Sequence, residues 1–111
     1  MSIEDVKQWY NAELDKKIAK ALGYVPISNA WDLYHAQYGV IPCYATKLEA
    51  AREAQAKAIK VDTETYIREL ASMMSLGYPF NRKAVAKLLQ ATPRQISEAA
   101  YITIQEVKEH E

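Results

Sequence analysis

The chain contains little glycine, proline and cysteine, and it carries no net charge. Of its 111 residues, 3 are glycine, 4 are proline and 1 is cysteine. Scarce glycine and proline argue against a turn-rich all-β fold and favour helices. Lysine and arginine total 14, and aspartate and glutamate also total 14. This balance excludes both a strongly basic nucleic-acid coat and an acidic mimic of DNA.

The single cysteine and the first residues of the chain bear on the cellular compartment in which we expect the protein. A single Cys43 excludes an intramolecular disulfide and a cysteine-based zinc site. We expect Cys43 to be a buried, inert thiol and the chain to be cytoplasmic. Glu4 and Asp5 stand where a signal peptide has a basic start followed by an apolar run. No apolar run approaches the roughly 18 residues of a membrane-spanning helix, so we expect no membrane partner.

What is present is the composition of one folded helical domain. Half of the residues (50%) are hydrophobic and 25% are charged, and 17 residues are alanine. The length provides one core and no second one. We therefore predict an all-α fold, a compact bundle of five or six helices, in a single domain 1–111. Within it, residues 1–61 form N-terminal helices with a partner or dimer surface, and residues 62–111 form the C-terminal helices.

Helix boundaries follow from capping residues and helix breakers. Ser2 opens the first helix, and Gly23 ends it. Small residues of the alanine-rich segment 47–61 predict that this helix packs tightly on another helix or lies exposed. Asp62 or Thr63 caps the helix after it, unless the two form one continuous helix. Thr92, Pro93 and Gln95 give three start signals together. The expected helices span 3–22, 28–39, 47–61, 62–76, 82–90 and 93–109.

Signatures of enzymes and metal sites are missing. The sequence has no glycine-rich phosphate loop and no nucleophile elbow. His35 and His110 have no metal-ligand spacing to each other or to Cys43. We expect no enzyme, no cofactor, no metal site and no small-molecule substrate.

Aromatic side chains are plentiful, with 8 tyrosines and 2 tryptophans. Trp31, Tyr34 and Tyr38 fall together on one side of the expected second helix. Such rings either pack at the edge of the core with their polar atoms in contact with solvent, or bind a partner protein as anchor residues. These three are the candidate partner-binding residues.

Residues Ala84 to Ala99 read AVAKLLQATPRQISEA, which resembles the helix-turn-helix of DNA-binding proteins. The pattern matches an apolar residue and alanine in the first helix (Val85 and Ala86) and further apolar positions (Leu88 and Leu89). Ala91 matches the turn. Ile96 matches the buried position that holds the two helices together. Gln90 stands where the turn usually has a left-handed glycine.

The resemblance implies that the second helix reads DNA. Its N-terminal residues Arg94, Gln95 and Ser97 would point outward to base edges or phosphates, with Arg82, Lys83 and Lys87 on phosphates. Residues 70–97 contain no acid and carry +4, which leaves −4 on the remainder. The predicted function is a small DNA-binding regulatory protein that binds duplex DNA as a homo-oligomer, because one such motif reads a half-site. The alternative is a non-enzymatic helical protein-interaction module, such as an assembly subunit, an adaptor or an inhibitor of the kind that phages and mobile elements encode.

Overall fold

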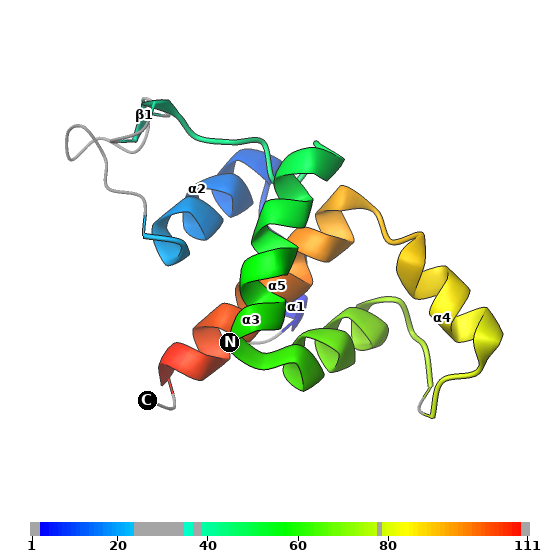
Figure 1. Cartoon of the computed structure of the whole chain (residues 1–111). Helices are drawn as coiled ribbons and strands as arrows, with labels where there is room; N and C mark the ends of the chain where they lie inside the picture. Colours follow the sequence, from blue (N-terminus) through cyan, green and yellow to red (C-terminus); the bar gives the residue numbers. More distant parts are fainter. Residues whose placement is uncertain (1–2, 24–34, 37–38, 78, 110–111) are drawn as a thin grey trace.

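The structure, a computed structural model, describes residues 3–23, 35–36, 39–77 and 79–109 (Figure 1). Its helices are α1 (Ile3–Lys7), α2 (Asn11–Ala21), α3 (Leu48–Met73), α4 (Arg82–Leu89) and α5 (Pro93–Glu109). Two-residue strands β1 (His35–Ala36) and β2 (Gly39–Val40) form an antiparallel pair in which His35 lies opposite Val40. The predicted all-α fold is confirmed.

The central helix is α5. Every residue from Ile96 to Ile104 is buried. α1, α2 and α3 all pack on α5, and α3 makes the largest contact, crossing it in Figure 1. A helix that is apolar around most of its circumference belongs in a core. The helix that the sequence assigned to DNA reading is therefore the one around which the domain is built.

α3 and α5 approach closely through small side chains. Ala51, Ala54 and Ala58 of α3 have no exposed surface, and neither do Ala99 and Ala100 of α5. Small side chains at buried positions allow two helix backbones to come near each other, and a close-packed core leaves no space there for a larger side chain. Of the two alternatives for the alanine-rich helix, packing on another helix and exposure, the structure shows the first.

α3 bends at Asp62, where the backbone leaves the helical region with φ −162° and ψ 95°. The Asp62 carboxylate accepts hydrogen bonds from the Thr65 backbone N–H at 3.1 Å and from the Thr65 hydroxyl at 2.8 Å. This is the arrangement of an N-cap, so the second half of α3 begins as the sequence predicts. Across the bend, Gln55 Nε2 donates to the Tyr66 hydroxyl at 2.8 Å.

We expect Asp62→Ala to lower the stability at neutral pH. The hydrogen bonds from Thr65 hold the pKa of Asp62 below its ordinary value. A depressed pKa contributes stability above the unfolded-state value, and this contribution is lost as the pH falls through the folded-state value. The deficit of Asp62→Ala should therefore shrink in acid. Urea unfolding followed by circular dichroism at a series of pH values measures it.

Asp62→Asn is the matched variant, because asparagine also caps helices but carries no charge. It should lose less stability than Asp62→Ala and show no titration of this group. Equal stabilities for the wild type and Asp62→Ala at every pH would contradict the assignment of Asp62 as a cap.

The predicted first helix is wrong at its middle, because the chain leaves the helix between Lys7 and Asn11. Leu14 and Ile18 are buried as expected, but Tyr10 is 85% exposed. The interruption leaves the carbonyl oxygens of Val6 and Trp9 available to a side chain of α5. A continuous helix would have used them in its own ladder.

The predicted second helix is wrong near its end, because His35–Ala36 pairs with Gly39–Val40 as extended backbone. This extended segment leads to Ile41, whose side chain is buried. Pro42 disfavours helical backbone at Ile41, the residue before it. Cys43 is exposed rather than buried. The nearby side chains of Ile41 and Tyr44 are buried at this point of the chain, and the Cys43 carbonyl accepts from the Lys47 N–H at 2.9 Å. The predicted partner residues Trp31, Tyr34 and Tyr38 lie outside the described residues.

Candidate functional site

The start of α5 is capped as the sequence predicts. The Thr92 backbone N–H donates to Gln95 Oε1 at 3.0 Å, and the Gln95 backbone N–H donates to Thr92 Oγ1 at 3.1 Å. Pro93 is the first helical residue. This reciprocal pair is a capping box, which satisfies two backbone donors at the start of α5. The Gln95 side chain is thus used within the chain, and it is partly buried.

We expect Thr92→Ala to lower the free energy of unfolding by about 1 kcal/mol, because it removes one half of the capping box. Chemical denaturation of the variant beside the wild type measures the loss. Thr92→Ser retains the hydroxyl and should keep most of the stability. If Thr92→Ser lost as much as Thr92→Ala, the hydroxyl would not be the cause.

Arg94 points into the domain rather than outward. Its Nη2 donates to the carbonyl oxygens of Val6 at 2.9 Å and Trp9 at 2.8 Å, and Nη1 donates to Asn11 Oδ1 at 3.0 Å. Nε lies 3.6 Å from Glu98 Oε2, and the Arg94 side chain is only 22% exposed. The expectation that Arg94 points outward toward DNA is wrong, because its donors bind the segment between α1 and α2. We call these five residues the Arg94 network.

Ser97 is also directed inward. It has no exposed surface, and its hydroxyl donates to the Tyr44 carbonyl at 2.6 Å. Asp15 of α2 accepts from the Ala45 backbone N–H at 2.8 Å, so α2 and α5 hold the same turn. The expected outward orientation of Ser97 is wrong, because this position of α5 faces the core.

The electrostatics of the Arg94 network are those of a partly buried ion pair. Glu98 is 5% exposed. Burial raises the pKa of Glu98, while the Arg94 guanidinium and the more distant Lys7 act in the opposite direction. Burial likewise raises the pKa of Asp15, against the hydrogen bond from Ala45 and the charge of Arg94. Each carboxylate therefore has a defined partner, which is typical of groups that fix a structure.

α4 stands at the edge of the molecule (Figure 1), and none of its residues is buried. Val85 is 46% exposed and Leu89 is 78% exposed. Arg82, Val85, Ala86 and Leu89 follow the spacing of one helix face, and all four are exposed. We call this face the open stripe. Val85, Ala86 and Leu89 match apolar positions of the helix-turn-helix pattern but do not pack on the next helix, whereas Leu88 packs against the core and Ala84 is half-buried.

The turn after α4 also differs from the expected one. Gln90 has φ −103° and ψ 13°, which is not left-handed. No glycine is needed at such a position, so Gln90→Gly should not stabilise the chain. Ala91 and Ile96 are buried as the resemblance implies. The basic residues Arg82, Lys83 and Lys87 are all exposed, as expected.

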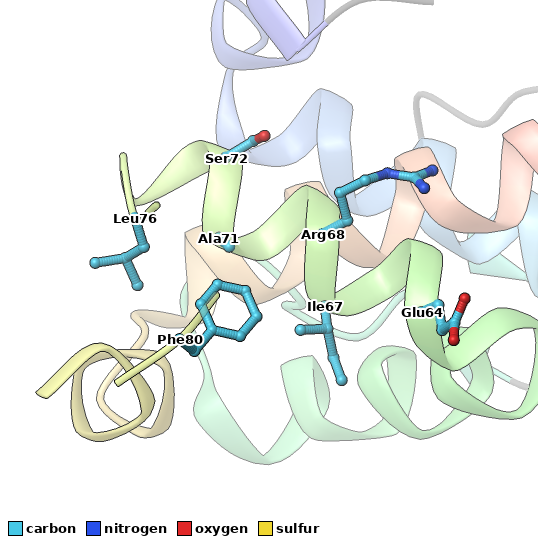
Figure 2. A pocket seen from close by; sticks show the side chains of 7 residues that line it. All are labelled: Glu64, Ile67, Arg68, Ala71, Ser72, Leu76 and Phe80. Atoms are coloured by element: carbon cyan, nitrogen blue, oxygen red, sulfur yellow. The ribbon is translucent and has the colours of Figure 1, made fainter. Parts of the chain in front are cut away.

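A pocket of about 610 Å³ lies along the second half of α3 and the segment that leads to α4. Figure 2 shows a row that runs from Leu76 through Phe80 and Ile67 to Glu64. We call this pocket the α3 groove. Leu76 also lines a second hollow with Lys83, Ala84 and Lys87, so the groove adjoins α4. The residues that line the α3 groove are Glu64, Ile67, Arg68, Ala71, Ser72, Leu76 and Phe80.

The floor of the α3 groove is apolar and its far end is acidic. Ile67 is 37% exposed although it is a large hydrophobic residue. Arg68 lies 4.0 Å from the Glu106 carboxylate, and this exposed ion pair offsets part of the charge of Arg68. Within the described residues, Glu64 forms no ion pair. The sequence carried a signal for this groove in the apolar residues on both sides of Gly77 and Pro79.

Comparisons with known proteins add no assignment, because no family model, curated protein or solved structure matches the chain. Among the described residues, no cluster of histidine, cysteine and carboxylate side chains is placed to hold a metal ion. No helix in these same ranges is both long enough and apolar enough to span a membrane.

Proposed function

We propose that the chain is a non-enzymatic helical protein-interaction module. Its partner-binding surface is the open stripe of α4 together with the adjoining α3 groove. One observation carries the proposal: α4 has no buried residue, yet it presents Val85 and Leu89 to solvent at 46% and 78% exposure. Clustered exposed apolar side chains of this kind mark interaction sites.

The chemistry of the surface favours a helical partner. An amphipathic helix binds a groove through apolar residues spaced three, four and seven positions apart. The open stripe has this spacing, and the α3 groove offers the apolar floor. An assembly subunit, an adaptor or an inhibitor uses such a surface. A homo-oligomer and a cytoplasmic location, both expected from the sequence, belong to the same proposal.

Selection from a displayed library of random helical peptides tests the proposal without a known partner. Peptides selected on the wild type should converge on an amphipathic pattern and should lose binding to Leu89→Asp. Leu48→Asp is the control, because Leu48 is also exposed, at 45%, but lies at the start of α3 outside the groove. Failure to converge, or equal binding to both variants, would overturn the proposal.

DNA binding is the second candidate, through α4 rather than the start of α5. The observation that favours it is the exposure of Arg82, Lys83 and Lys87 in a stretch 70–97 that contains no acid. Lysine and arginine bind phosphates and make affinity fall steeply as salt rises.

Fluorescence anisotropy of a random duplex at low salt tests this candidate. Binding that weakens with salt and disappears in Lys83→Glu/Lys87→Glu would support it. Lys16→Glu/Lys20→Glu on α2 is the charge-matched control. The absence of binding at low salt would remove the DNA candidate and leave the protein-interaction proposal unaffected.

A further inference from the structure

We infer that the occupant of the α3 groove is the open stripe of α4 from a second copy of this chain. In a two-fold dimer each copy would then place its α4 on the groove of the other. The inference rests on the proposed function, because it names the partner of the same surface.

The first argument is the fit between the two surfaces. The α3 groove has a volume of about 610 Å³, which lies within the range of about 300–1,000 Å³ for pockets that bury a drug-sized ligand. Val85 and Leu89 are neighbours on the exposed side of α4. Ile67, Leu76 and Phe80 supply the apolar lining against which they would pack. Each copy thus carries both an apolar ridge and an apolar receptor for it.

The second argument is charge complementarity. Arg82 begins the open stripe and lies seven positions before Leu89, on the same face. The far end of the groove carries Glu64, while the charge of Arg68 is offset in part by Glu106 at 4.0 Å. Counted together, Glu64, Arg68 and Glu106 leave that end with a net negative charge, so an α4 helix laid along the groove can bring its Arg82 cation toward an acid. We therefore expect Arg82 of one copy to lie near Glu64 of the other.

The third argument is symmetry. A two-fold interface repeats the same contact twice, so one weak helix-in-groove contact becomes two. The net charge of the chain is zero, so two copies do not repel each other overall. A short helix in a groove buries less than a standard interface, and we expect a reversible dimer with a dissociation constant on the order of micromolar.

Sedimentation equilibrium over a wide concentration range tests the inference on the full chain. The wild type should associate reversibly to a dimer. Leu89→Asp should weaken the dimer at least tenfold, because it places a charge on the apolar ridge. Leu48→Asp should leave the dimerisation constant within twofold of the wild type. Circular dichroism checks that both variants are folded, as their exposed positions lead us to expect.

A charge exchange separates this contact from other modes of self-association. Arg82→Glu alone and Glu64→Lys alone should each weaken the dimer severalfold, because each places like charges together. An equimolar mixture of the two variants should associate as tightly as the wild type. In that mixed dimer one contact pairs the original residues and the other pairs the exchanged ones. No merely local effect on folding predicts this recovery.

A chain that stays monomeric up to several hundred micromolar overturns the inference. So does a dimer that Leu89→Asp and the charge exchange leave unchanged. Either result leaves the proposed function standing if selected peptides still bind the wild type and not Leu89→Asp. If neither peptides nor a second copy depend on Leu89, the inference and the proposed function fall together.

Discussion

Replacing Arg94 by alanine should lower the free energy of unfolding by about 3–5 kcal/mol, the range for removing one partner of a buried ion pair. The variant loses three donor contacts, to the carbonyls of Val6 and Trp9 and to Asn11 Oδ1. It also leaves Glu98, 5% exposed, without the guanidinium 3.6 Å away. Because 22% of the Arg94 side chain is exposed, we expect the lower end of the range.

The same variant should show a characteristic pH dependence. Burial already raises the pKa of Glu98, and Arg94 opposes that rise. Without Arg94 the folded-state pKa lies further above the unfolded-state value, and stability is then lost as the pH rises through the interval between the two. Below that interval the carboxyl is protonated in both states. The deficit of Arg94→Ala should therefore be largest at neutral pH and smaller in acid.

Urea unfolding of four proteins separates the ion pair from the other contacts: the wild type, Arg94→Ala, Glu98→Gln and the double variant. The double variant should be more stable than Arg94→Ala alone at neutral pH, because it carries no unpaired buried carboxylate. A stable, fully folded Arg94→Ala that loses only DNA affinity would instead favour Arg94 as a reader of DNA. That outcome would contradict the inward orientation described above.

Ala54→Leu should lower the free energy of unfolding by about 1–3 kcal/mol, the usual cost of adding atoms to a filled core. Ala54 has no exposed surface and lies on α3, the helix that makes the largest contact with α5. Three added carbon atoms can be accommodated only if the two helices move apart, and the remaining small side chains would then lose their contacts.

Ala56→Leu is the matched control, because Ala56 is exposed on the same helix. Leucine and alanine have similar helix propensities, so this variant should stay within about 0.5 kcal/mol of the wild type. Thermal and urea unfolding compare the two. If Ala54→Leu and Ala56→Leu lowered the free energy of unfolding equally, helix propensity rather than close packing would explain the loss.

Features encoded by neighbouring residues could be predicted from the sequence. The capping box of Thr92 and Gln95 and the cap at Asp62 both join residues three positions apart. The small residues of α3 likewise indicated either close packing on another helix or exposure, without the identity of that helix. The all-α class follows from the same local signals.

The candidate site could not be predicted in this way, because it depends on distant contacts. Arg94 binds Val6, Trp9 and Asn11, which lie near the other end of the chain. In the sequence alone, a basic residue at the start of a helix is equally consistent with a DNA contact. A signal for the burial of α5 was nevertheless present. Ala99, Ala100, Ile102 and Ile104 make that helix apolar on more than one face, which is typical of a core helix and not of one that lies in a DNA groove.

The exposure of α4 beside the buried core helix α5 is the feature on which both proposals rest. Thiol accessibility tests it most directly, with Ser97→Cys and Ala86→Cys each made in a Cys43→Ala background. Ala86 is exposed and Ser97 has no exposed surface. In a solution dilute enough to keep the chain monomeric, the thiol on α4 should react with a disulfide reagent at the rate of a free cysteine. The thiol on α5 should react only as the chain unfolds. Fast reaction of the α5 thiol in the folded chain would contradict the account.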